Sequence, residues 1–199
     1  MSNTSSKVRQ TALTAVLTAI VVLMAFTPLG YLRVGLVSIT FLVIPVVIGG
    51  IVLGPVRGGF LGAVFGATSF IQCFGMDAFG TALLALNPVA AAAACFVPRI
   101  LVGVVAGVLF PVLRRFGSAL AFISTAVAGT LTNTILFIGM VVLFFQNSYF
   151  GGSPFWTIFV GFFTFNVALE LLVGVVASAG LSAVLNRFVM KVPRYEVSG

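Results

Sequence analysis

The sequence contains no histidine and only three carboxylate side chains, Asp77, Glu170 and Glu196, in 199 residues. The absence of histidine excludes Ser-His nucleophilic machinery, histidine metal sites and imidazole proton shuttling. A paired-carboxylate active site would have to join Asp77 to Glu170, which the spans given below place about half a bilayer apart. No Walker-type G-x-x-x-x-G-K-[ST] loop is present, so the chain lacks that machinery for ATP hydrolysis. The sequence therefore predicts a non-catalytic protein without a metal or cofactor.

Charge is also scarce. Charged residues make up 7% of the chain and apolar residues 61%, with a mean hydropathy of +1.28. Soluble domains carry about 25% charged residues, so this composition predicts a membrane protein. The net charge of +7 does not indicate a nucleic-acid partner, because the cations stand at the ends of apolar runs and form no stripe with aromatic residues. The apolar runs continue almost end to end, which predicts one domain over residues 1–199.

Six apolar runs are long enough to cross a bilayer, which takes about 20 residues per helix. They cover residues 8–27, 34–53, 56–74, 96–113, 118–146 and 155–182. Breaker segments such as "LGPVRGG", "RRFGS" and "QNSYFGGSP" separate them. The fold class predicted is an all-α membrane protein, a bundle of six transmembrane helices. A longer loop, "FGMDAFGTALLALNPVAAAAA", lies between the third and fourth spans and has room for a short helix.

The distribution of cations predicts the orientation of this bundle. An even number of spans puts both termini on one side, and cytoplasmic loops carry an excess of Lys and Arg. Only Arg33 and Arg99 fall on the side opposite the termini. The cations on the terminal side are Lys7, Arg9, Arg57, Arg114, Arg115, Arg187, Lys191 and Arg194. Both termini are therefore predicted to be cytoplasmic, in the cell membrane.

The fifth and sixth spans carry the polar residues Asn133, Asn166 and Glu170. A charge at the bilayer centre costs about 2.5–3.5 kcal/mol on insertion scales, so such groups usually face a bundle interior or a cavity. One interpretation is an interhelical clamp, in which the Asn133 amide donates to Glu170. The other is the floor of a solute cavity that opens to the outside, and the two are compatible.

Two features at the predicted outer ends of the spans also allow two interpretations each. Arg99 follows Pro98 at the predicted start of the fourth span, where it either binds an anionic group or anchors the helix to lipid headgroups. Cys73 and Cys95 end adjacent spans and are either bridged or free thiols.

Small residues recur at four-residue spacing in three spans. The third span has Gly54, Gly58, Gly62 and Gly66, and the fourth has Gly103 and Gly107. Such spacing lets membrane helices approach closely, which predicts tight internal packing. The first span repeats the spacing with Thr11, Ala15 and Ala19, as an internal packing face or a docking face for another membrane subunit.

The order of these segments resembles the substrate-binding S-components of energy-coupling factor (ECF) vitamin transporters. The likeness covers nearly the whole chain, through the small residues of the first span and "LGPVRGGFLGAVFG", "PRILVGVVAGVLF", "GTLTNT" and "FNVALE". It implies a subunit that captures a micronutrient from outside and works with a transmembrane coupling subunit and two ATPase subunits. In that family an AxxxA motif on the first helix docks onto the coupling subunit, which maps here to Ala15 and Ala19, next to Thr11.

The resemblance also implies a ligand site in the outer half of the bundle. It maps to Asn87, Arg99, Asn133 and Asn166 as ligand contacts, with Glu170 as the cavity floor or a support behind it. The segments "AFTPLGYLRVGLVSITFLVIPVVIGG" and "CFGMDAFGTALLALNP" look most like the pantothenate-type branch, although other acidic vitamins would also suit Arg99.

The function expected is capture of a vitamin in an outward-facing cavity and its delivery by reorientation of the subunit. Two alternatives remain. One is a stand-alone proton-coupled secondary transporter with Glu170 as proton carrier. The other is a structural or assembly protein of the membrane without a ligand.

Overall fold

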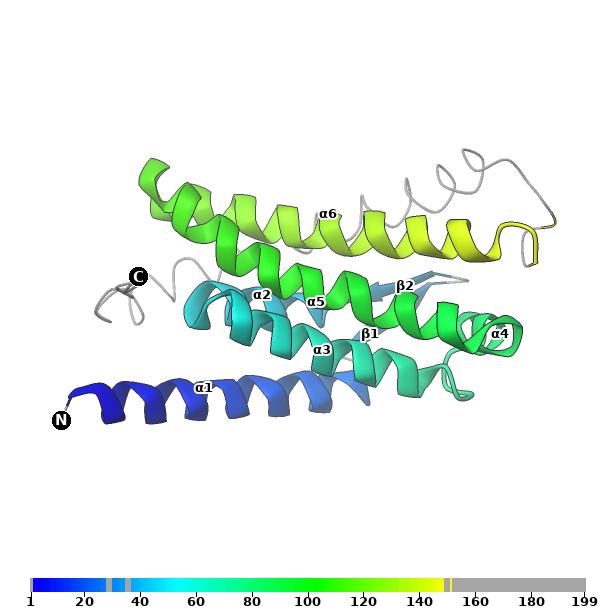
Figure 1. Ribbon diagram of the computed structural model, residues 1–199, viewed down its shortest axis with the longest axis horizontal. Coiled ribbons are helices and arrows are strands. Elements are labelled where there is room, and N and C mark those ends of the chain that lie inside the picture. Colours follow the sequence, from blue (N-terminus) through cyan, green and yellow to red (C-terminus); the bar gives the residue numbers. More distant parts are fainter. Residues whose placement is uncertain (1, 28–29, 35–36, 149–150, 152–199) are drawn as a thin grey trace.

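The structure is a computed structural model that describes residues 2–27, 30–34, 37–148 and 151. The described part consists of helices lying side by side along one axis, with a small hairpin at one end (Figure 1). Its elements, in chain order, are α1 (Ser2–Ala25), β1 (Tyr31–Val34), β2 (Val37–Thr40), α2 (Val43–Leu53), α3 (Pro55–Gln72), α4 (Ala78–Leu86), α5 (Pro88–Leu113), the 3-10 helix η1 (Arg114–Phe116) and α6 (Ser118–Phe145).

The predicted helical fold class is confirmed for this part of the chain. Three described helices are long and apolar enough to cross a membrane, at Ser6–Ala25, Pro88–Leu113 and Leu120–Phe145. The third predicted span, 56–74, corresponds to α3. The sixth, 155–182, lies outside the described residues, so the count of six crossings stays a prediction.

The second predicted span, 34–53, is wrong in its first half. β1 and β2 pair as an antiparallel hairpin, with Tyr31 opposite Thr40 and Val34 opposite Val37. The helix α2 begins only at Val43, and its 11 residues cover about 16 Å, which is too short to cross a bilayer alone. The run "VSIT" is rich in β-branched residues, which favour strands, and hydropathy alone does not separate the two structures.

The fourth span begins earlier than its predicted start at residue 96. Asn87 is the N-cap of α5: its Oδ1 accepts a hydrogen bond from the backbone nitrogen of Ala90 at 3.1 Å, and Pro88 occupies the first turn. Pro98 lies inside the helix and does not begin it. Arg99 is therefore about three turns inside α5, away from the helix N-terminus.

Glycines hold α3 against α5, as the four-residue spacing predicted. Gly58 faces the backbone carbonyl of Gly103, and Gly62 faces that of Arg99. A Cβ placed on Gly66 would lie 3.0 Å from the carbonyl oxygen of Cys95. Gly54 has a different role, since its φ of +88° forms the turn between α2 and α3. The two helix backbones are thus in direct contact over about two turns.

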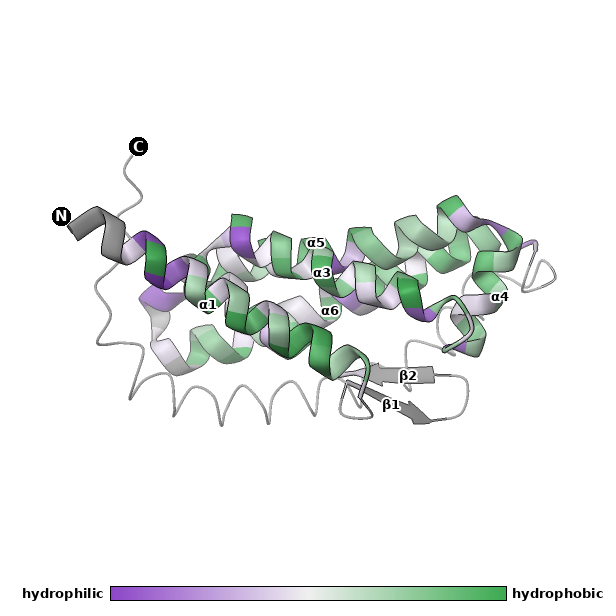
Figure 2. Ribbon diagram, turned by 90° about the horizontal axis from the view of Figure 1, so that it is seen from below, coloured by the Kyte–Doolittle hydropathy of each residue, from purple (hydrophilic) through white to green (hydrophobic). Residues whose placement is uncertain are grey.

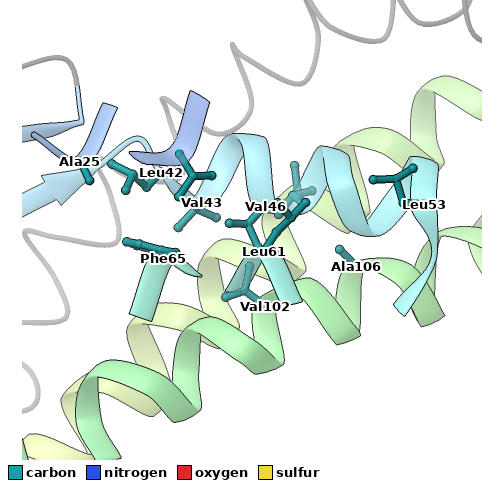
Figure 3. Close-up of a cluster of buried hydrophobic side chains, with 12 residues drawn as sticks. Ala25, Leu42, Val43, Val46, Leu53, Leu61, Phe65, Val102 and Ala106 are labelled. Carbon is teal, nitrogen blue, oxygen red and sulfur yellow. The ribbon is translucent and has the colours of Figure 1, made fainter. Parts of the chain in front are cut away.

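The largest hydrophobic core of the described residues joins five helices beside this contact, with Ala126 as the contribution of α6 (Figure 3). Val46 of α2 and Leu61 of α3 are fully buried at its centre. Val21 comes from α1 and Val102 from α5. The core therefore ties α1 and α2 to the α3–α5 pair.

Five of the seven described cations gather at one end of the bundle, whereas Arg33 lies in the hairpin and Arg99 inside α5. Figure 1 places the start of α1, the turn between α2 and α3, and η1 at the same end. These segments carry Lys7, Arg9, Arg57, Arg114 and Arg115. In Figure 2 the beginning of α1 is hydrophilic, whereas its later turns are largely hydrophobic. The hairpin, α4 and the loop between α3 and α4 lie at the opposite end.

We predict that Gly103→Ala destabilises the protein by about 1–3 kcal/mol, because the added methyl group would overlap the Gly58 backbone and neither backbone can move independently. Thermal unfolding in detergent or nanodiscs measures this. The matched control is Gly139→Ala in α6, where a Cβ meets no atom of the described residues within 4 Å. Equal loss of stability in both variants would contradict the assigned contact.

Candidate functional site

Arg99 is the only buried charged side chain among those described, with 7% of its surface exposed. Its guanidinium carbon lies 5.4 Å from the ring centroid of Phe65 on α3 and 4.6 Å from that of Phe137 on α6. The cation is thus enclosed where α3, α5 and α6 meet. A headgroup anchor needs an exposed guanidinium, so this burial does not fit the anchor interpretation.

Pro98 explains one of the hydrogen bonds of Arg99. Proline has no backbone N–H, so residue 98 cannot donate to the carbonyl of Ala94 one turn earlier in α5. Arg99 Nη1 donates to that carbonyl oxygen instead, at 2.5 Å. Pro98 therefore leaves the Ala94 carbonyl without a backbone donor, and the side chain of Arg99 supplies a donor instead. This hydrogen bond fixes the guanidinium beside α5.

The other interactions of Arg99 do not balance its charge within the described residues. Arg99 Nε has no hydrogen-bond partner there. Asp77 is the only carboxylate described, and its Oδ2 accepts from the backbone nitrogen of Gly80 at 2.7 Å, at the start of α4. Burying a cation costs several kcal/mol. Aromatic faces return about 2 kcal/mol when desolvated, which offsets only part of that cost.

Asn133 lies in the same layer of the bundle as Arg99. It is buried in α6 between Gly129 and Phe137, each one turn away on the same helix face. A Cβ on Gly129 would contact Val102 of α5 at 3.6 Å, and Phe137 contacts Arg99. The same Cβ would lie 2.7 Å from Val47 of α2, so Asn133 lies on the face of α6 that packs against α2 and α5. Its Oδ1 has no hydrogen-bond partner in the described part of the chain.

The remaining predicted ligand residues are not brought to this layer by the described structure. Asn87 is exposed, caps α5, and lies about 18 Å from Arg99 along the helix axis. Asn166 and Glu170 lie outside the described residues. Their assignment to the ligand site, and that of Asn87, stay predictions.

The two cysteines are free thiols in the structure. Both are buried, and their Sγ atoms lie 3.9 Å apart, whereas a disulfide bond is about 2.05 Å long. Cys73 Sγ also contacts the carbonyl oxygen of Ser69 at 3.4 Å. The pair joins the end of α3 to α5 one turn from Arg99.

Sequence reasoning missed the two rings that enclose Arg99. Phe137 follows Asn133 by one helical turn, so the four-residue spacing was a usable signal for a shared face. Phe65 precedes Gly66 in the glycine-rich helix but is one of 21 phenylalanines, and nothing local distinguishes it. Only the packing of α3 on α5 brings it to Arg99.

The small residues of the first helix form an exposed stripe. Thr11, Ala15 and Ala19 are all exposed on α1. Leu17 and Val21 pack into the core from one face of α1. Ala19, two residues from each in the sequence, points about 160° away from both and so lies on the opposite face. Packing within the described part therefore leaves the stripe uncovered.

Comparison with known proteins identifies the family. Residues 9–190 match the family described as ECF transporter, substrate-specific component. This chain belongs to that family. The ECF component is 30% identical over 201 residues to the pantothenate transporter PanT of Leuconostoc mesenteroides subsp. mesenteroides, covering 93% of this chain and 95% of the relative. It is 35% identical over 119 residues to the pantothenic acid transporter PanT of Lactococcus lactis subsp. cremoris, covering 55% of this chain and 59% of that one.

Family membership and the apolar helices together show that the chain is a membrane protein of vitamin uptake. It is a substrate-specific subunit of a transporter, which agrees with the non-catalytic role expected from the missing histidine and Walker loop. The sequence-based assignment to the ECF S-components is thereby confirmed.

We predict that Asn87→Ala destabilises the ECF component by about 1 kcal/mol, because α5 loses its N-cap. Asn87→Ser keeps an oxygen acceptor for the Ala90 nitrogen and should retain the stability. Thermal unfolding of both variants separates capping from ligand contact, since a ligand role would lower affinity in the Ser variant without lowering stability. A fully stable Ala variant would contradict the capping role.

Proposed function

We propose that the protein captures a carboxylate-bearing vitamin, with pantothenate as the first candidate, and delivers it through an ATP-driven ECF importer. The observation that carries this proposal is the buried guanidinium of Arg99, whose Nε has no partner among the described residues. The relatives named as pantothenate transporters favour this ligand over other acidic vitamins.

A ligand carboxylate at Arg99 would complete its charge balance. Charge-assisted hydrogen bonds are roughly twice as strong as neutral ones, and the planar guanidinium favours two parallel bonds to one carboxylate. Phe65 and Phe137 lie next to the guanidinium and exclude water there, which strengthens the attraction. We expect the carboxylate to bind along the edge of the guanidinium that carries Nε, which has no partner among the described residues.

Asn133 is suited to the uncharged part of the same ligand. Pantothenate carries an amide and two hydroxyl groups besides its carboxylate, and the buried Oδ1 of Asn133 would accept a hydrogen bond from one of them. Asn166 and Glu170 are proposed to extend this polar site from the sixth span, with Glu170 at its floor. Asn87, at the start of α5, is proposed to contact the ligand near the entrance.

The end of the bundle that carries the cations is proposed to face the cytoplasm. Positively charged loops are retained on that side, and Lys7, Arg9, Arg57, Arg114 and Arg115 all lie there. The hairpin and α4 would then face outward, at the entrance for the ligand. The Thr11–Ala15–Ala19 stripe is proposed as the docking face for the coupling subunit, and two ATPase subunits would supply the energy for reorientation.

We predict that Arg99→Ala weakens pantothenate binding by about 1.5–3 kcal/mol, because it removes charge-assisted hydrogen bonds to the carboxylate. Calorimetric titration of the purified subunit measures this. The matched ligand is pantothenol, in which an alcohol replaces the carboxylate. Wild-type protein should prefer pantothenate, and the Ala variant should lose that preference. A preference that survives the substitution would place the carboxylate elsewhere.

We predict that Ala15→Leu with Ala19→Leu blocks assembly with the coupling subunit and leaves pantothenate affinity unchanged. Both residues are exposed, so the larger side chains fit the isolated subunit but prevent close helix approach. Copurification with the coupling module measures assembly. The control is Ala85→Leu, the same change at an exposed alanine of α4. Normal assembly of the double variant would contradict the docking assignment.

A further inference from the structure

We propose that Arg57 and Gln72 are positioning residues that fix α1 in one register on α3, and thereby place the docking stripe relative to the ligand-binding helices. This inference rests on the docking part of the proposed function. The two residues contact α1 itself, at the two ends of α3. We call the hydrogen-bonded pair Gln72–Ala25 the first clamp and the pair Arg57–Gln10 the second clamp.

The first clamp closes the end of α1. Ala25 is the last residue of this helix, and its carbonyl is one of the four that lack a partner within the helix. Gln72 Nε2 donates to that carbonyl oxygen at 2.7 Å. Gln72 is itself the last residue of α3 and only 4% exposed, so this bond is made away from solvent and lipid.

The second clamp joins the first half of α1 to the first turn of α3. Arg57 Nη1 donates to Gln10 Oε1 at 2.5 Å, and the bond is partly buried. Both clamps connect residues 47 positions apart in the sequence. The distance between the two clamps is therefore the same along α1 as along α3, about 22 Å. Equal spacing on two helices that run in the same direction is what a fixed register requires (Figure 1).

Apolar packing between the clamps is less directional than a hydrogen bond. Leu17 and Val21 pack against the core, but lipid chains are as apolar as these side chains, so burial alone does not drive helix association in a bilayer. Directional hydrogen bonds lose their geometry when one helix shifts by a residue, about 1.5 Å. The clamps therefore select one position of α1 among packings of similar energy.

The helix that α1 is clamped to also touches the candidate ligand site. Gly62 of α3 lies against the backbone carbonyl of Arg99, and Phe65 lies over its guanidinium. The glycine contact prevents α3 from moving independently of α5. A continuous path of rigid contacts thus runs from the docking stripe through the clamps and α3 to Arg99.

The test begins on the subunit alone, so that it does not depend on docking. Leu23 of α1 and Val108 of α5, both exposed, are changed to cysteine and carry the spin labels. The native thiols are removed by Cys73→Ala and Cys95→Ala so that only these two positions are labelled. The clamp variant combines Arg57→Met with Gln72→Met, which keep side-chain length and remove the donors. We expect the distribution of distances between the two labels to broaden or shift relative to that of the parent protein. An unchanged distribution would overturn the inference.

The functional arm measures assembly with the coupling module and pantothenate binding. The clamp variant should assemble about tenfold more weakly and bind pantothenate within about threefold of the parent. Unchanged assembly with a broadened distribution would also overturn the inference. If Ala15→Leu with Ala19→Leu assembles normally, the docking assignment is wrong. The distance measurement on the isolated subunit still tests the clamps in that case.

A reciprocal exchange separates positioning from direct contact with the partner. Gln10→Arg with Arg57→Gln keeps the hydrogen bond and reverses its direction, whereas Arg57→Gln alone loses the cation. We expect the exchange to restore the parent distance distribution and assembly. Failure of the exchange, with correctly folded protein by thermal unfolding, would assign Arg57 a direct partner contact and overturn its positioning role.

Discussion

The direct contact between the backbones of α3 and α5 supports the rest of the described structure. Gly58, Gly62 and Gly103 leave no side chain between the two helices, so the carbonyl groups of one face the glycines of the other. Gly50 of α2 also meets the carbonyl of Gly103, which brings a third helix to the same point. In a membrane, close packing of this kind replaces the hydrophobic drive that water supplies to soluble proteins. The glycine contact thereby sets the distances at which all larger side chains meet.

Arg99 depends on that contact for its environment. Because α3 approaches so closely, the ring of Phe65 reaches the guanidinium from one helix while Phe137 reaches it from another. Pro98 supplies a free carbonyl at Ala94, so the side chain is fixed along α5. A buried cation held in this way is preorganised for an anionic group, since little rearrangement is needed when one binds. The role proposed for this geometry is recognition of the carboxylate of the substrate.

Polar groups in the described bundle fall into two sets with different surroundings. Gln72 and Arg57 bond to α1, and Asn87 bonds to the first turn of α5, so their hydrogen bonds hold helices in place. Arg99 and Asn133 instead leave buried polar atoms without a partner among the described residues. Buried polar atoms are expensive to leave unsatisfied in any interior. Thr40 and Thr125 also leave such an atom, so the buried charge of Arg99 is what distinguishes the candidate ligand site.

The sequence by itself determined the membrane environment, the helical class, the glycine packing and the chemistry that is missing. These follow from composition and short-range spacing, which act through solvation and helix periodicity. It also supplied the family, because the order of several modest motifs carries more information than each one alone. The candidate residues Arg99 and Asn133 were found because polar groups are rare in apolar spans.

Only the tertiary structure decided how the apolar runs divide and what surrounds each polar residue. Hydropathy measures apolar character and not backbone conformation, so it did not reveal that residues 31–34 and 37–40 form strands or that α5 begins at Pro88. The enclosure of Arg99 by Phe65 and Phe137, and the bond from Gln72 to Ala25, join residues far apart in the chain. Such contacts depend on how helices pack, and no local pattern encodes that packing.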